Sequence, residues 1–353
     1  VLLMLPVSLS ANHFRYGTIS WEPTADNGTH ITIRVKMQNG WTANHTSFRE
    51  SGDYDTFVSG FVGSIKDDLI KIYWGDGTTT DVDIKIISRE DTTGTASSNC
   101  TGSDNQTSGK CIDSTISEIG EYSSGTWTTG VTHSYPDNGT TEYLLHWGGY
   151  ARTPTNNNAN DARCCGGEWR NQTKINIGGA YDGNKSPVGA VPPIIQAQDN
   201  KAFNYQLVAT DADGDSLNYR WGKLNEFFLD PGNSGAGPSS TDYFTKPAGM
   251  TLSSSGLIEW DIKDSVTSAG GVWTVDNATE GSLWTSVVMV EDLDNNGSVK
   301  SYIPIDFFVK IASASNDPPA FTKFPTGTRT VSVGTTKTIK IKSTDDSGVA
   351  PTI

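Results

Sequence analysis

The stretch YIPIDFFVKI, residues 302–311, decides the fold class of this chain. Apolar side chains recur there at every second position, which is the pattern of a β-strand with one buried face. The alternating residues are Ile303, Ile305, Phe307, Val309 and Ile311. Pro304 lies on the opposite face and has no N–H to donate to a ladder, so we expect an edge strand or a strand start here.

The rest of the chain has the same character. Shorter alternations of apolar and polar residues occur over 30–37 and 81–86. Ile and Val together outnumber Leu about three to one, and β-branched side chains favour the pleated surface of a sheet. The sequence has no apolar stripe of helical period over a dozen residues. It therefore predicts an all-β protein.

Length and charge limit the classes of function. At a prior of about 150 residues per domain, the 353 residues predict two to three domains. The chain carries 26 Lys and Arg against 40 Asp and Glu, and the resulting net charge of −14 repels nucleic acid and anionic membranes. The 10 Trp and 12 Tyr residues exclude a disordered chain, which would be poor in aromatic residues.

Two proline-rich stretches, 186–193 and 312–321, divide the chain because proline stiffens a connector and removes backbone donors. We expect a first β-domain over 12–187, with a turn-rich insertion, and a second over 188–313. Residues 314–353 then form only the first strands of a third domain.

The chain begins with an apolar segment, residues 1–11, which opens VLLMLPV. It is too short to span a bilayer as a helix. Two interpretations remain open. One is the tail of a signal peptide cleaved after Ala11, and the other is a retained strand that is buried in a neighbouring subunit.

Nine Asn-x-Ser/Thr sequons indicate a secreted or cell-surface glycoprotein, provided that they lie in exposed loops. They are Asn27, Asn44, Asn99, Asn105, Asn138, Asn171, Asn184, Asn277 and Asn296. Asn184 is the weakest, because Pro187 directly follows the serine of its sequon. The alternative is that a chain rich in Asn and Thr contains sequons by chance.

The four cysteines are Cys100, Cys111, Cys164 and Cys165. Their spacing does not match a zinc site. Disulfides between the 100–111 loop and the adjacent pair at 164–165 fit better, and they imply an oxidising, extracellular compartment. Of the three connectivities, we disfavour the one that joins the two neighbours, because that bridge would be strained.

Residues 188–311 resemble the Ig-like and cadherin-like domains that occur in tandem on large extracellular cell-surface glycoproteins. The matching stretches are FNYQLVATDADGDSLNYRW (203–221) and PAGMTLSSSGLIEWD (247–261). The resemblance implies a β-sandwich with Trp221 and Trp260 in its core.

Residues 70–147 are similar to PKD-type sandwich domains. The similarity rests on IYWGDGTTT (72–80) and VTHSYPDNG (131–139). It implies that the WGDG turn and the HSY strand stack on one another. The stretch VSVGTTKTIKIKSTDDSG (331–348) repeats the register of YQLVATDADGD, which suggests a partial third domain. The expected fold is thus a tandem of Ig-like and PKD-like β-sandwiches.

Acidic loops make calcium a candidate cofactor, because calcium prefers six to eight oxygen ligands. One loop offers Asp211, Asp213 and Asp215, and a second offers Asp292 and Asp294. Neither is an EF-hand, since Ile303 stands where the second loop would need glutamate. Asp317 lies in a linker that resembles the cadherin calcium linker. The alternative is that these residues simply form turns.

The sequence predicts no enzyme. Its five histidines form no His-Glu-x-x-His pair, and it contains no Gly-x-Ser-x-Gly elbow. We therefore expect no catalytic residues.

Two functions fit these observations. The first is a structural subunit of an N-glycosylated extracellular fibre or cell-surface coat, in which copies of the chain join head to tail by β-strand addition. The alternative is a calcium-dependent adhesive or ligand-binding ectodomain that does not polymerise. Neither function involves nucleic acid or a membrane span in this chain.

Overall fold

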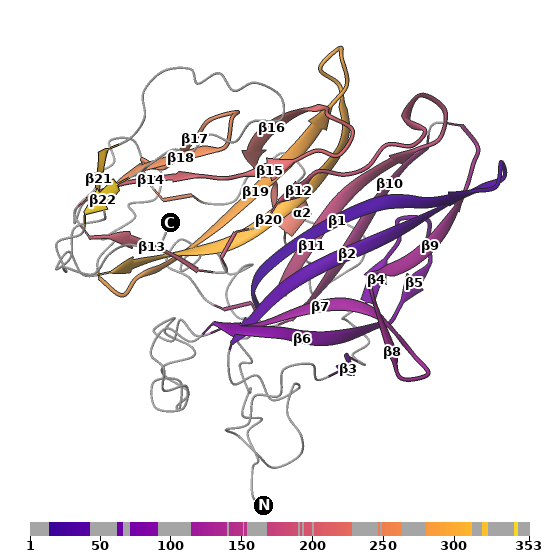
Figure 1. Ribbon diagram of the computed structural model, residues 1–353, viewed down its shortest axis with the longest axis horizontal. Coiled ribbons are helices and arrows are strands. Elements are labelled where there is room, and N and C mark those ends of the chain that lie inside the picture. The colour runs from indigo at the N-terminus through magenta and orange to yellow at the C-terminus, as the bar shows by residue number, and fades with distance from the viewer. Residues whose placement is uncertain are drawn as a thin grey trace, which may run out of the picture.

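The structure is a computed structural model of the full chain (Figure 1). It describes residues 14–42, 62–65, 71–90, 114–139, 141–150, 152–153, 168–189, 191–192, 194–199, 201–227, 246–247, 249–262, 280–312, 320–323 and 342–344. Within these ranges nearly all regular structure is β-strand, so the predicted fold class is confirmed.

Two groups of strands follow one another along the chain. The first group is β1 (Phe14–Asp26), β2 (His30–Thr42), β3 (Val62–Ile65), β4 (Lys71–Tyr73), β5 (Thr79–Thr80), β6 (Val82–Glu90), β7 (Ser114–Ser123), β8 (Thr126–Thr129), β9 (Val131–Pro136), β10 (Thr141–Tyr150) and β11 (Glu168–Ile177). A 3-10 turn, η3 (Gly179–Tyr181), ends this group.

The second group is β12 (Val188–Gly189), β13 (Ile194–Gln198), β14 (Ala202–Gln206), β15 (Ala209–Thr210), β16 (Ser216–Trp221), β17 (Thr251–Leu252), β18 (Leu257–Asp261), β19 (Leu283–Leu293) and β20 (Val299–Ala312). A single helical turn, α2 (Leu224–Phe227), follows β16. Two further strands, β21 (Ala320–Lys323) and β22 (Lys342–Thr344), pair with each other.

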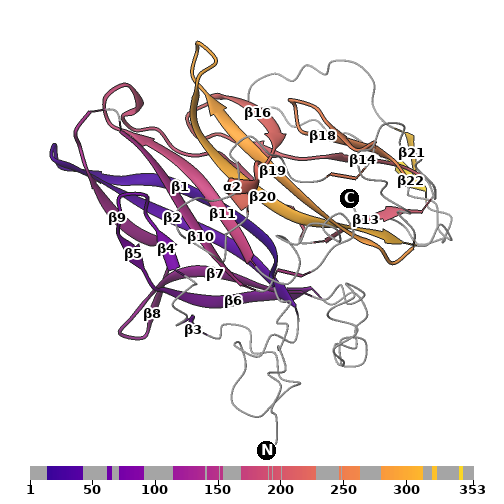
Figure 2. The same cartoon turned by 180° about the vertical axis from the view of Figure 1, so that it is seen from behind.

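The strand β20, which contains the stretch that decided the fold class, joins the two groups. The largest sheet has 15 strands, and its main path runs β3-β6-β7-β2-β1-β20-β11-β10-β4-β5. In addition, β20 pairs with β19 on one side and with β13 in parallel. Figures 1 and 2 show β19 and β20 lying between the N-terminal strands and the smaller β14–β18 layer.

The expectation that β20 has one buried face is wrong, because both of its faces are buried. The alternating residues from Ile303 to Ile311 lie in one apolar cluster, and Tyr302, Asp306 and Phe308 on the other face are buried as well. The physical reason is that α2 packs against Tyr302 on this second face and that Arg152 contacts Asp306 there.

Pro304 does not mark an edge. It pairs with Met289 of β19 and is buried. On its other side, β11 pairs with β20 at Tyr302 and β1 pairs at Ile305 and Asp306. The proline therefore stands in the gap between two neighbouring ladders, where no backbone donor is needed.

The first hydrophobic core contains residues from Phe14 to Ile177. Four fully buried tryptophans from β2, β10, β11 and the turn after β4 fill it: Trp41, Trp74, Trp147 and Trp169. The ring of Phe14 stacks on Trp169 at a centroid distance of 4.1 Å, and Trp147 meets Trp169 edge-on at 5.1 Å. The first contact joins β1 to β11, and the second joins the paired strands β10 and β11.

The second core is formed by residues 191–311, together with Tyr16 of β1. The three-stranded layer β14-β18-β17 packs over β19 and β20 (Figure 1). Trp260 of β18 meets Trp284 of β19 edge-on at 5.5 Å. Trp260 is therefore in the core as expected, whereas Trp221 is only partly buried at its margin.

A buried ion pair lies where the two groups of strands meet. The Arg152 guanidinium contacts both carboxylate oxygens of Asp306, and its Nη1 donates to Oδ1 at 3.1 Å. The exposed fractions of Arg152 and Asp306 are 1% and 0%. The guanidinium also lies over the Phe14 ring, 5.3 Å from its centroid. The two groups are thus linked by a paired charge as well as by the shared sheet.

Candidate metal centre

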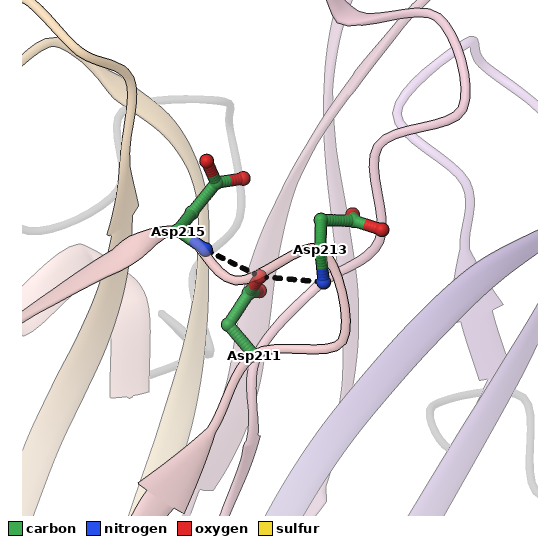
Figure 3. Close-up of side chains that lie close together, drawn as sticks. All are labelled: Asp211, Asp213 and Asp215. Carbon is green, nitrogen blue, oxygen red and sulfur yellow. Dashed lines mark hydrogen bonds between the residues drawn. The ribbon is translucent and has the colours of Figure 1, made fainter.

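The loop between β15 and β16 brings three carboxylates together. Asp211 Oδ1 accepts hydrogen bonds from the backbone N–H groups of Asp213 (2.8 Å) and Asp215 (3.0 Å), as Figure 3 shows. Gly214 has a φ of 82°, a left-handed conformation that suits glycine. Ligand atoms of the three aspartates lie within 4.8 Å of one another. This spacing fits one ion, because calcium binds oxygen at about 2.3–2.6 Å.

Two lysines approach the same loop from different parts of the chain. Lys185 Nζ contacts Asp213 Oδ1 at 2.6 Å, and its backbone N–H donates to Asp213 Oδ2 at 2.7 Å. Burial raises the pKa of Asp213, but the hydrogen bonds from Lys185 outweigh it and the net shift is downward. Lys300 Nζ forms an ion pair with Asp215.

A second pair of polar side chains lies next to this loop. Asp292, at the end of β19, is fully buried, and its Oδ2 accepts from Asn184 Nδ2 (3.2 Å) and Ser301 Oγ (3.1 Å). Burial raises the pKa of Asp292 to about 6, and the carboxylates of Asp211 and Asp215 push it in the same direction. Lys300 opposes this shift.

Three oxygens of this region are buried without a hydrogen-bond partner among the described residues: Oδ1 of Asn184, Oδ2 of Asp211 and Oδ1 of Asp292. A buried polar atom without a partner is costly and rare, so each needs an electropositive neighbour. Carboxylate and amide oxygens are ligands that calcium accepts.

The charge balance favours the same ligand class. Four carboxylates (Asp211, Asp213, Asp215 and Asp292) share two lysine ammonium groups, which leaves two negative charges uncompensated. A divalent cation would neutralise them. Asp292 lies outside the group of three aspartates that share the 4.8 Å spacing, so it would complete the site from the side of β19.

The second predicted loop is divided by the fold. Asp292 faces the first loop, because β16 pairs with β19 and brings Leu217 opposite Asp292. Asp294 instead accepts the backbone N–H groups of Asn296 and Ser298, each at 2.8 Å, and so forms the β19–β20 turn. Asp292 and Asp294 thus have different partners, and calcium binding at either one stays a prediction. Asp317 lies outside the described residues.

The predicted glycosylation sites fall into three sets. Asn27, Asn138 and Asn296 are exposed in turns between strands. Asn171 and Asn184 have exposed fractions of 0% and 4%, and glycosylation at these two positions stays a prediction. The others lie outside the described residues, as do all four cysteines: Asn44, Asn99, Asn105, Asn277, Cys100, Cys111, Cys164 and Cys165.

Two histidines in the first core pack against aromatic rings. His133 stacks on Trp74 at 4.4 Å and contacts Asp76 Oδ2 at 2.8 Å, which places the HSY strand on the WGDG turn. His146 stacks on Tyr73 at 4.6 Å. Burial lowers the pKa of His146. Both side chains contribute to packing.

Comparison with known proteins gives one sequence relative. No family model matches the chain. It is 24% identical to integrin beta-like protein C of Dictyostelium discoideum in an alignment 273 residues long that covers 72% of this chain. The chain spans about a tenth of the length of that relative.

Several solved structures align with the chain at low similarity. The two tandem V-type regions of VCBP3, a v-region-containing chitin-binding protein, align over 83% of this chain and 99% of theirs, with 10% identity and a TM-score of 0.31. Sidekick-1 immunoglobulin domains 1–5 align over 87% of this chain and 74% of theirs, with 8% identity and a TM-score of 0.18. TM-scores this low carry no argument about function. In the described part of the chain, no helix is long and apolar enough to cross a membrane.

Proposed function

We propose that this chain is an adhesive or ligand-binding part of an extracellular or cell-surface protein, and that a calcium ion joins its two cores. The exposed sequons Asn27, Asn138 and Asn296 support an extracellular location. The relative named integrin beta-like protein C supports an adhesive role.

The observation that carries the proposal is the set of unpartnered buried oxygens beside the aspartate loop. Asn184 belongs to a segment anchored on the first core, since Trp21 of β1 exchanges hydrogen bonds with Ser186: the Trp21 N–H donates to Ser186 Oγ at 2.8 Å. Asp211 and Asp292 belong to the second core's strands and loops. An ion held by all three would fix the position of one core on the other.

Calcium fits this donor set better than other common divalent metals. Every candidate ligand atom is a carboxylate or amide oxygen, whereas zinc sites favour histidine and cysteine. Magnesium needs near-ideal octahedral geometry and retains several waters. Calcium accepts six to eight oxygens in flexible geometry, and water or a ligand would complete the positions that the chain does not fill.

A fibre of head-to-tail subunits has less support. It depends on strand exchange between residues 1–11 and the segment from 314 onward. The first of these lies outside the described residues, and β21 and β22 in the second pair with each other.

The proposal is tested by melting the full chain in calcium and in EGTA. A ligand that binds only the native state at 100 times its Kd stabilises that state by about 2.7 kcal/mol, so calcium should raise the Tm. Asp213→Asn should reduce the shift, and Asp294→Asn should leave it intact. Beads coated with the chain should also adhere to cells in calcium and detach in EGTA. Identical melting curves in calcium and in EGTA would refute the role of calcium. Adhesion that persists in EGTA would show that adhesion does not require the ion.

A further inference from the structure

The β7–β8 hairpin carries an aromatic surface remote from the aspartate loop. Its two turn residues, Ser124 and Gly125, both have positive φ (50° and 81°), as two-residue hairpin turns require. This turn places Tyr122 directly opposite Trp127. Figures 1 and 2 show the hairpin projecting from the edge of the first group of strands.

The Trp127 ring is held in one orientation. Its Nε1–H donates to Glu118 Oε1 at 2.7 Å and to Thr129 Oγ1 at 3.2 Å. Gly120 lies against both the ring and the backbone of β8, because a Cβ built on it would be 2.4 Å from Thr128 O and 2.5 Å from Trp127 Cζ2. The ring can therefore lie close to β7 only while residue 120 has no side chain. A preorganised ring loses little conformational entropy when it binds a ligand.

This surface exposes mainly aromatic carbon to solvent. Tyr122 is 53% exposed and Trp127 is half-buried, while the indole N–H is already bonded within the hairpin. An exposed aromatic pair of this kind is not needed to fill a core. It is a surface on which the apolar face of a ligand can stack.

Hydrogen-bonding groups surround the two rings. The Lys85 ammonium lies 5.9 Å from the centroid of the Trp127 ring. Glu118 projects from the same face of β7 as Tyr122, and its Oε1 accepts from Trp127 and Thr129. The surface thus combines exposed aromatic carbon with a charged donor and a charged acceptor.

We propose that this face of the β7–β8 hairpin binds a neutral oligosaccharide. A pyranose ring has an apolar face of C–H groups that stacks on indole or phenol, and hydroxyls at its rim that pair with a carboxylate and an ammonium. Glu118 and the net charge of −14 oppose an acidic ligand.

A protein partner fits less well. A stable protein interface buries about 800 Å² on each side, with an apolar centre. Among the described residues, the other exposed large hydrophobic side chains are Leu144, Val188 and Val208, and they lie outside this hairpin. This inference does not depend on calcium.

The test uses the full chain labelled with 5-fluorotryptophan, because ¹⁹F NMR resolves the 10 tryptophans individually. Trp127→Phe assigns the Trp127 resonance. Cellohexaose, mannohexaose and N-acetylchitohexaose are titrated separately to millimolar concentration. At least one should shift the Trp127 resonance in a saturable manner. Loss of one stacked ring should weaken binding about tenfold, so Tyr122→Ala should raise the Kd by that factor.

Gly120→Ala provides a second variant, because it keeps both aromatic side chains while its Cβ would clash with the Trp127 ring and with the Thr128 carbonyl oxygen, so that the ring and β8 must shift away from β7. It should weaken binding as Tyr122→Ala does, while Leu144→Ala, an exposed apolar residue of β10, should leave the Kd unchanged. The exposed Tyr122 can be replaced without loss of fold, which circular dichroism checks. Absence of a shift with all three sugars would overturn the proposal, and so would equal binding by wild type, Tyr122→Ala and Gly120→Ala.

Discussion

Replacing either partner of the Arg152–Asp306 ion pair should destabilise the junction between the two groups of strands. Both side chains are buried, and the guanidinium contacts both carboxylate oxygens. Arg152→Met leaves the buried Asp306 carboxylate without its guanidinium partner. Asp306→Leu leaves the buried Arg152 guanidinium without its carboxylate partner. Breaking a buried pair in this way costs about 3–5 kcal/mol.

The double variant Arg152→Met/Asp306→Leu should recover most of that loss. Two apolar side chains of similar volume need no solvation, and such replacements of buried pairs are often neutral. Urea unfolding of the wild type, both single variants and the double variant gives the coupling free energy directly. At about 2–4 °C per kcal/mol, each single variant should also lower the Tm by about 6–20 °C.

A loss below about 1 kcal/mol in both single variants is the behaviour of an exposed pair. That result, or a double variant as unstable as the sum of the singles, would refute the argument that this pair holds the junction.

Three further outcomes are expected. Gly17→Ala should cost about 1–3 kcal/mol in urea unfolding, because its Cβ would lie 1.7 Å from Asn171 Oδ1; an unchanged midpoint would show that Asn171 can move. The pKa of Asp76 is lowered: burial raises it, but hydrogen bonds from Thr78 and His133 outweigh burial. The stability from this group is therefore present above its unfolded pKa and lost as pH falls through its folded pKa, so Asp76→Asn should cost more at pH 6 than at pH 2. Peptide mass spectrometry of secreted chain should find glycans at Asn27, Asn138 and Asn296 but not at Asn171; a glycan at Asn171 would contradict its burial.

The sequence revealed the strands but not how they meet. Alternation identified β20, because the period of two is a local property. That alternation could not indicate that its second face is buried, since the groups packed on that face include α2 and Arg152, which are distant in the sequence. Pro304 wrongly suggested an edge strand for the same reason. Whether a missing N–H matters depends on the neighbouring strand.

The candidate site was predictable in part. Asp211, Asp213 and Asp215 share one short loop, so their spacing alone indicated a cluster. Asn184 and Asp292 reach it through the η3 turn and the β16–β19 pairing, which the sequence does not encode in any local pattern. The one available signal was the proline two residues beyond Lys185, which weakened the sequon at Asn184 as a glycan site.

Calorimetric titration of calcium into the chelator-treated full chain measures binding at the proposed site itself. We expect one saturable site per chain, with binding weakened in both Asn184→Ala and Asp213→Asn and retained in the matched control Asp294→Asn. Absence of binding at millimolar calcium would refute the calcium site. An affinity that Asn184→Ala leaves unchanged would contradict the proposal that the ion joins the two cores, because the first core would then contribute nothing to the ion.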